Sequence, residues 1–273
     1  MNLKQLFLTE NNCYKAGVKF NPTGIMVHST GANNPNLKRY VGPDDGLLGK
    51  NQYDNHWNQP KPGGSLICVH AFIGKLADGS IATYQTLPWD MRGWHSGKGA
   101  NGTANDTHIG FEICEDNKED ALYFSKVYWE AVELCAMLCK TYGIKPEKPF
   151  LIDHAEGHAL GIASDHGDVG YWFTKHGKSM DAFRADVKSR LSAPTPTENP
   201  TAGQETAPTF IPATVVKDCP TYSKLNKKQL PLGEVYAGET VMYLGDYGGL
   251  AAIIYPTSAS EKIAFVDKVN LTF

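Results

Sequence analysis

Several features that would assign this chain to a common class are missing from its sequence. It has no apolar run long enough to cross a membrane, and its six cysteines include no CxxC pair. These absences argue against a membrane span, a disulfide framework and a thiolate zinc finger. The 26 Lys and Arg are balanced by 29 Asp and Glu, so no basic excess suggests a nucleic-acid partner. The GxSxG turn of serine hydrolases is also absent.

The N-terminal segment lacks the pattern of an export signal. In MNLKQLFLTENNCYK the first lysine is followed by only a few apolar residues before acids and amides appear. We therefore expect neither a secretory signal nor membrane insertion, and we predict synthesis in the cytoplasm.

A change in composition divides the chain. Residues 192–209, SAPTPTENPTAGQETAPT, contain four prolines, five threonines and no large apolar residue. Such a segment cannot repay the entropy of ordering and is typical of a semi-extended linker. We predict one domain over 1–191 and a second over 210–273.

The first domain alternates between two kinds of segment. The apolar runs TGIMVH, SLICVHAFI, HIGFEI and PFLIDH have the length of buried strands, whereas residues 120–143 place apolar side chains at helical spacing. A second helix is expected over 179–191, with Ser179 as its N-cap. This alternation predicts an α/β domain with a central mixed β-sheet flanked by helices.

After the linker the pattern changes to short strands separated by glycine turns. About 64 residues of this kind predict a small, strongly bent β-barrel. It contains no histidine, so we expect binding rather than catalysis there. The candidates for a binding groove are its aromatic residues Tyr222, Tyr236, Tyr243, Tyr247, Tyr255 and Phe265.

All nine histidines lie in the first domain, and three of them directly follow apolar runs. These are His28, His70 and His154. Ligands gather at one edge of the sheet in α/β folds, and neutral imidazole is the commonest zinc ligand. A structural role is the alternative for any single one, but three together favour a metal site.

The stretch IASDHGDVG offers a carboxylate to complete a three-ligand zinc site. It contains Asp165, His166 and Asp168. If GDV is extended, His166 and Asp168 share a face and Asp165 points away. Glu112, inside the run HIGFEI, is costly to bury alone, so it is either a base beside a zinc-bound water or half of an ion pair with a lysine or arginine.

Other metal patterns fit less well. HAEGH at 154–158 has its glutamate in a different slot from HExxH, and its glycine would weaken a helix. The HxE half of the zinc-deaminase signature occurs without the PCxxC half. Cys135 and Cys139 fall near one face of the long helix, where we expect core packing.

Three segments carry a resemblance to a known family: IMVHST, THIGFEICED and LIDHAEGHALGIASDHGDVGYWFTKHGKSMDAFRADV. Over roughly residues 20–191 the chain resembles the type 2 N-acetylmuramoyl-L-alanine amidases, zinc enzymes related to peptidoglycan-recognition proteins. The likeness is strongest to endolysins of phages and prophages of Gram-positive bacteria. From about residue 210 the chain more loosely resembles bacterial SH3-type wall-binding modules, through GETVMYLG and the strand pattern.

The resemblance implies a role for each candidate residue. It places the Zn²⁺ ligands at His28, His154 and Asp168. Asp165 is a rival third ligand, because the interval from second to third ligand is longer here. Glu112 would assist the water, and His166, where many relatives have lysine, would stabilise the oxyanion.

Two further positions follow from the resemblance. Family members have a tryptophan-histidine pair at the border of the substrate groove, here Trp94 and His95. His70 matches a strand inside the family's core, so a supporting or substrate-binding role is expected rather than zinc ligation.

The resemblance implies a peptidoglycan hydrolase that cuts the amide between N-acetylmuramic acid and L-alanine. Without an export signal, such an enzyme would reach the wall by holin-dependent release. The alternatives are a non-catalytic peptidoglycan-binding protein of the same fold and a zinc peptidase acting on the stem peptide. Because the third ligand and the acid are both present, we favour the enzyme.

Overall fold

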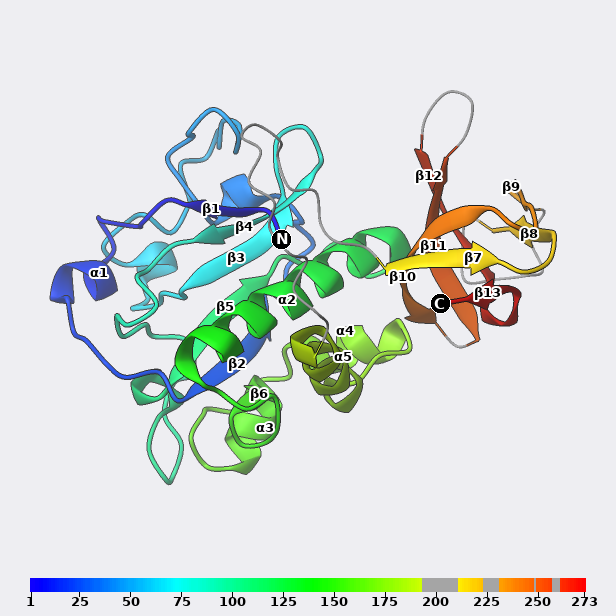
Figure 1. Cartoon of the computed structure of the whole chain (residues 1–273). Helices are drawn as coiled ribbons and strands as arrows, with labels where there is room; N and C mark the ends of the chain where they lie inside the picture. The colour runs from blue at the N-terminus through cyan, green and yellow to red at the C-terminus, as the bar shows by residue number, and fades with distance from the viewer. Residues whose placement is uncertain (193–210, 223–230, 248, 257–260) are drawn as a thin grey trace, which may run out of the picture.

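The computed structural model describes most of the chain and contains two main β-sheets (Figure 1). The described residues are 1–192, 211–222, 231–247, 249–256 and 261–273. The linker predicted over 192–209 lies outside them except for its first residue. No helix in the described ranges has the length and apolar content needed to span a membrane.

The larger sheet has six strands in the order β1-β4-β3-β5-β2-β6. Their bounds are Leu3–Gln5 (β1), Gly24–Ser29 (β2), Ala71–Lys75 (β3), Ile81–Gln85 (β4), His108–Ile113 (β5) and Leu151–Asp153 (β6). β3 and β4 pair antiparallel, whereas the other neighbours pair parallel. The sheet is therefore mixed, as the sequence predicts.

Five α-helices belong to this part of the chain. They are Asn12–Ala16 (α1), Ala121–Tyr142 (α2), His154–Ala159 (α3), Val169–Lys175 (α4) and Met180–Ser192 (α5). The long helix α2 lies along the sheet, and α5 packs beside it (Figure 1). Both helices occur where the sequence predicts them, and the Ser179 hydroxyl caps α5 by accepting the Ala182 N–H. Short 3₁₀ turns occur at Leu37–Arg39, Pro62–Gly64 and Ala104–Asp106.

Alternation along β2 and β5 decides which side chains face α2. Ile25, Val27 and Phe111 share one buried core with that helix. Successive side chains of a strand point to opposite faces, so His28 and Glu112 face away from α2. These two residues are also direct partners in the parallel β2–β5 register.

The C-terminal part forms a five-stranded antiparallel sheet, β12-β11-β10-β7-β13, and a separate β8–β9 pair. The bounds are Ile211–Val215 (β7), Cys219–Thr221 (β8), Gly233–Val235 (β9), Thr240–Tyr247 (β10), Leu250–Pro256 (β11), Glu261–Asp267 (β12) and Leu271–Thr272 (β13), with a 3₁₀ turn at Lys268–Asn270. Leu244, Leu250 and Phe265 pack into the same core as α2. The C-terminal sheet is thus packed against α2.

The segment around His70 differs from the prediction. β3 begins at Ala71, so His70 precedes a strand and does not end one. Cys68 and Val69 are fully buried, and Cys68 forms only an isolated bridge with Trp94. Apolar content cannot distinguish such a buried connection from a strand.

The segment IASDHGDVG is a bent loop and not an extended strand. Gly161 and Asp168 both have positive φ, and bends occur between them. The alternation that predicts a shared face for His166 and Asp168 is therefore wrong. His166 is exposed whereas Asp168 is partly buried, so their positions are set by tertiary contacts.

Candidate metal centre

Three residues from adjacent elements converge at one edge of the six-stranded sheet. β5, β2 and β6 are parallel neighbours, so their carboxyl ends meet there. His28 lies near the end of β2, His154 directly follows β6 as the first residue of α3, and Asp168 precedes α4. Among the described residues this trio is the group of His, Cys, Asp or Glu whose ligand atoms could share a metal.

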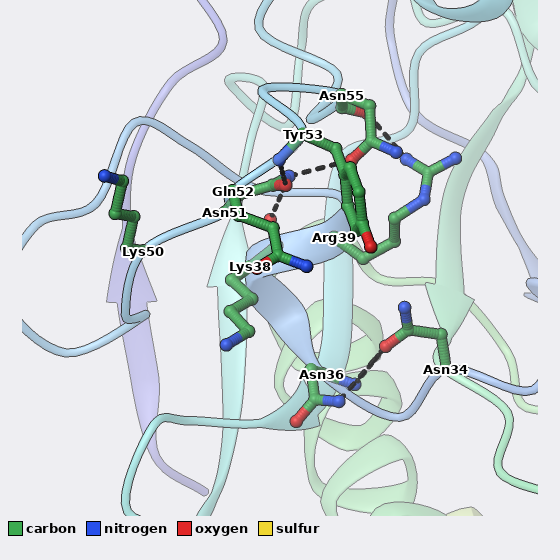
Figure 2. A pocket seen from close by; sticks show the side chains of 9 residues that line it. All are labelled: Asn34, Asn36, Lys38, Arg39, Lys50, Asn51, Gln52, Tyr53 and Asn55. Atoms are coloured by element: carbon green, nitrogen blue, oxygen red, sulfur yellow. Dashed lines mark hydrogen bonds between the residues drawn. The ribbon is translucent and has the colours of Figure 1, made fainter.

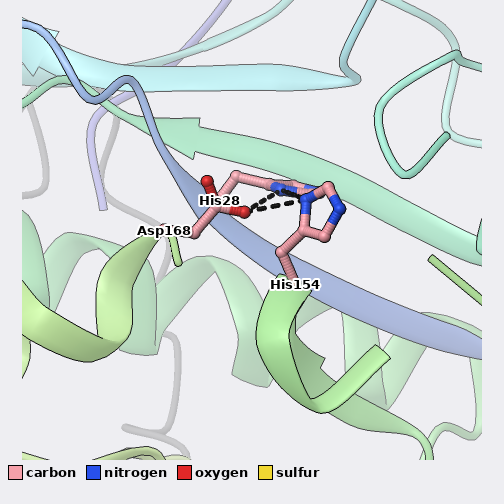
Figure 3. A group of neighbouring side chains, drawn as sticks. All are labelled: His28, His154 and Asp168. Carbon is pink, nitrogen blue, oxygen red and sulfur yellow. Dashed lines mark hydrogen bonds and ion pairs between the residues drawn. The ribbon is translucent and has the colours of Figure 1, made fainter. Parts of the chain in front are cut away.

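The three ligand atoms lie within hydrogen-bonding distance of one another (Figure 3). Asp168 Oδ2 is 2.9 Å from Nδ1 of His28 and 2.9 Å from Nδ1 of His154. The two Nδ1 atoms are 3.2 Å apart. A carboxylate and two imidazoles are a donor set that suits zinc.

The backbone of Asp168 is held in an unusual conformation. Its φ of 40° and ψ of −134° are sparsely populated by residues other than glycine. Although it is the N-cap of α4, its side chain makes no capping hydrogen bond. The carboxylate is instead directed at His28 and His154, so the strained turn serves the site rather than the helix.

A chain of hydrogen bonds fixes the tautomer of His28. His95 Nε2 lies 3.1 Å from the His108 carbonyl oxygen, which only accepts, so this nitrogen carries the proton. His95 Nδ1 then accepts from His28 Nε2 at 3.0 Å. The remaining nitrogen of His28, Nδ1, presents its lone pair to Asp168 and His154. Burial lowers the pKa of His28 and of His95, which favours these neutral forms.

Gly110 makes room for this arrangement. A Cβ atom at this position would lie 2.4 Å from the His95 ring, so any other residue would push the imidazole off β5. A glycine inside a strand often marks such a close approach. The glycine of the IGFE segment therefore has a packing reason, because it leaves room for the His95 ring beside β5.

Ser164 orients the second imidazole. Its hydroxyl lies 3.3 Å from the Ser96 carbonyl oxygen, 3.3 Å from His154 Nε2 and 3.1 Å from His166 Nδ1. When Ser164 donates to Ser96, it accepts from His154 Nε2–H, and the Nδ1 lone pair of His154 faces the centre. The His166 ring packs against His154, with 4.8 Å between centroids. Sequence reasoning missed Ser164 because one serine in a loop carries no distinctive pattern.

Glu112 lies beside the trio as a poorly solvated acid. Its Oε2 is buried without a hydrogen-bond partner in the described part of the chain, and no lysine or arginine there forms an ion pair with it. Burial raises the pKa of Glu112 well above its usual value, and the charges of Asp168 and Glu115 raise it further. An acid of this kind is suited to accept a proton near neutral pH.

Asp168 responds to the same surroundings in the opposite direction. Burial opposes its ionisation, but the contacts with His154 and His28 outweigh burial and lower the pKa of Asp168. The centre therefore holds one carboxylate that is charged and one, Glu112, that is ready for protonation. Two acids with divergent pKa values are typical of hydrolytic sites.

The sequence matches the family described as N-acetylmuramoyl-L-alanine amidase over residues 19–171, more than half of the chain. The chain belongs to this amidase family. The matched range contains every residue of the centre described above.

Individual relatives share less of the chain. The N-acetylmuramoyl-L-alanine amidase CwlH of Bacillus subtilis (strain 168) is 38% identical over 94 residues, which are 30% of this chain and 36% of CwlH. The chain thus spans about a third of the curated relative that it matches. The PlyG catalytic domain (19% identity, TM-score 0.49, 74% of this chain and 100% of that one) and the Staphylococcus aureus hydrolase AmiA (20%, 0.48, 70% and 82%) are similar solved structures. At TM-scores below 0.5, neither adds to the assignment.

The expected groove residues of this amidase-family chain lie at different depths. Trp94 is half-buried, with the Arg92 guanidinium 5.2 Å from its ring centroid. His95 contacts the side of the His28 ring that carries Nε2, with 3.0 Å between this atom and His95 Nδ1. His70 is fully buried, accepts the Gly110 N–H at Nδ1 and donates from Nε2 to the Met91 carbonyl. It has no face left for a substrate and instead supports His95, whose ring centroid is 6.0 Å away.

The other candidates lie apart from the trio. Asp165 is exposed at a bend of the loop. Glu156 of the HAEGH segment completes a capping box with Asp153 and pairs with Arg184 at 2.8 Å. Cys135 and Cys139 are in the apolar core, and all six cysteines are free and buried.

Proposed function

We propose that the chain hydrolyses bacterial peptidoglycan at the amide between N-acetylmuramic acid and L-alanine, using zinc held by His28, His154 and Asp168. The observation that carries the proposal is the convergence of these ligands beside Glu112, whose buried Oε2 has no partner among the described residues. CwlH is named for the same activity.

The residues fit a zinc ion. Ligand atoms of a tetrahedral site, at about 2.0–2.1 Å from zinc, lie roughly 3.3 Å from one another. The separations of 2.9, 2.9 and 3.2 Å are close to that edge length. Both imidazoles also offer lone pairs at Nδ1, because their Nε2–H groups are used elsewhere. Zinc bound there would lower the pKa of a water and polarise the scissile carbonyl.

Three side chains of the protein have the remaining roles in the reaction. Glu112 accepts the proton of the attacking water and passes it to the leaving amine of L-alanine. His166 donates from Nε2 to the oxyanion of the tetrahedral intermediate, and its Nδ1 lies 3.1 Å from the Ser164 hydroxyl. Asp168 stays ionised because its two histidine partners lower its pKa.

Product analysis tests the activity. Purified walls digested with the protein should gain new L-alanine amino termini, with no new reducing sugar ends and no new termini within the stem peptide. Stem-peptide termini would identify a zinc peptidase instead. Binding without any new terminus would identify the non-catalytic alternative.

His166→Ala should retain zinc and lose activity. His166 is exposed, so its removal leaves the fold intact, but loss of one oxyanion donor typically costs about 10²–10³ in kcat. Metal analysis and muropeptide turnover on the same preparation check both parts. Loss of zinc, or an unchanged kcat, would contradict the role given to His166.

We also propose that residues 210–273 form an SH3-type wall-binding module, joined to the amidase domain of residues 1–191 by the linker at 192–209. Its antiparallel strands support this, and holding the enzyme on the wall would raise the local substrate concentration. Tyr236 is 52% exposed, whereas Tyr255 and Phe265 are buried. Tyr236 is therefore the better groove candidate. Phage origin and holin-dependent release stay predictions.

A further inference from the structure

A polar cavity of about 200 Å³ lies on the segment between β2 and β3, outside the metal centre (Figure 2). Nine residues line it: five Asn or Gln side chains, Tyr53, and the three cations Lys38, Arg39 and Lys50. Tyr53 is 74% exposed. A cavity with this lining attracts an anion and offers amide donors and acceptors around it.

No acid in the described ranges forms an ion pair with these three cations. The aspartates of the same segment are turned to other partners. Asp44 and Asp45 accept N–H groups of their own loop, and Asp54 pairs with His56 at 2.8 Å. The positive charge of the cavity is therefore not compensated by its own segment.

Hydrogen bonds between backbone and amides hold the cavity wall in place. Asn51 Nδ2 donates to the Lys38 carbonyl at 2.8 Å and to Asn55 Oδ1 at 2.9 Å. Arg39 Nη1 donates to the Asn55 carbonyl at 2.6 Å. These bonds use the main chain of Lys38, not its ammonium group, so the wall is ordered while that charge stays available.

A second cavity, of about 290 Å³, links this wall to the catalytic side of the sheet. Arg39 and Asn55 line both cavities, and the second one also reaches Thr30, two residues beyond His28. Thr30 follows the end of β2, so the second cavity begins near the edge of the sheet at which His28 lies.

The aromatic wall of the second cavity lies on the same face of the sheet as Glu112. Tyr40 stacks on Phe72 with 5.2 Å between ring centroids, and Trp57 meets Phe72 edge-on at 4.9 Å. Phe72 is the direct β3 partner of Glu112 in the parallel register. The two cavities and the acid thus belong to one side of the molecule.

We infer that the cavity at Lys38, Arg39 and Lys50 is an anion subsite that binds a carboxylate of the stem peptide. The inference rests on the proposed function, because it needs the stem peptide to run from the centre through the second cavity. The amide side chains suit a peptide backbone, and Arg39, at the junction, suits a carboxylate. A phosphodiester of another wall polymer has the same charge, so the test must separate the two.

Two synthetic stem peptides provide the probes: one with free carboxylates and one with the same carboxylates converted to primary amides. Neither contains phosphate. Calorimetry would give Kd for both with the full-length protein, the Lys38→Gln/Lys50→Gln variant, and a Lys126→Gln/Lys188→Gln control. The control has the same charge change at exposed positions on α2 and α5.

The wild type should prefer the free acid, and the Lys38→Gln/Lys50→Gln variant should lose roughly 3- to 10-fold in affinity for it. The control should keep the preference. Three results would each overturn the subsite. They are no binding of the free-acid peptide, the same preference for the free acid over the amide in the wild type and the cavity variant, and an equal loss of affinity in the control variant. Since these peptides contain no scissile bond, the result is independent of wall cleavage, which tests the proposed function separately.

Discussion

Replacing Asp168 with alanine is expected to abolish zinc binding and wall lysis together. Asp168 Oδ2 contacts both proposed histidine ligands at 2.9 Å, so its loss would remove one of the three proposed ligands and the charge that would balance the ion. Removing a residue that merely supports a ligand costs about 10- to 100-fold in metal affinity. Removing the ligand itself should cost more, and activity should fall below detection.

Two companion variants separate loss of the ligand from loss of the fold. Asp165→Ala makes the same charge change at an exposed position of the same loop and should keep both zinc and activity. Asp168→Gly suits the backbone, because glycine adopts a φ of 40° without the roughly 1–3 kcal/mol of strain that other residues bear. It should fold normally and still fail to bind zinc.

Metal content and thermal unfolding of the metal-free proteins measure these effects. If Asp165→Ala lost zinc while Asp168→Ala kept it, the third ligand would be Asp165. If both Asp168 variants unfolded before the metal-free wild type, their loss of zinc would report a structural role.

Apolar runs of strand length and helix periodicity were enough to predict the architecture of the N-terminal part. Ile25 and Val27 pack on α2 while His28 faces away, and TGIMVH forms a strand, as its apolar run predicts. The same reasoning was wrong for SLICVHAFI, because Cys68 and Val69 are buried by a connection that pairs with the Trp94 segment. Burial leaves the same apolar signature in both cases.

At the metal centre, too, the sequence pattern predicts some of the positions and not others. His28 and His154 could be predicted because parallel neighbouring strands bring their carboxyl ends to one edge. Asp168 reaches them through a strained turn that period-two alternation does not describe. His95 can reach His28 only because residue 110 is a glycine. A Cβ atom at Gly110 would lie 2.4 Å from the His95 ring. Sequence spacing alone does not indicate which imidazole fills the room left by a glycine.

Glu112→Gln is the variant expected to separate metal binding from proton transfer. Glutamine has nearly the shape of glutamate, and Glu112 is not one of the three proposed ligands, so zinc content should be unchanged. Without a carboxylate to accept the water's proton, kcat should fall by about 10²–10⁴. Because Glu112 acts on the water and not on substrate binding, KM should change far less than kcat.

Turnover of a soluble muropeptide, with zinc measured on the same sample, gives both values. Glu115→Gln is the matched control, since Glu115 is a buried acid near Glu112 that accepts hydrogen bonds from Ser29 and Tyr171. It should lose stability rather than proton transfer, so its kcat per folded, zinc-loaded molecule should stay much closer to that of the wild type. A Glu112→Gln protein that kept its zinc and turned over at the wild-type rate would exclude Glu112 as the base. In that case the raised pKa of Glu112 would reflect burial and the charges of Asp168 and Glu115 without a role in the reaction, and the proton would have to leave through His166 or solvent.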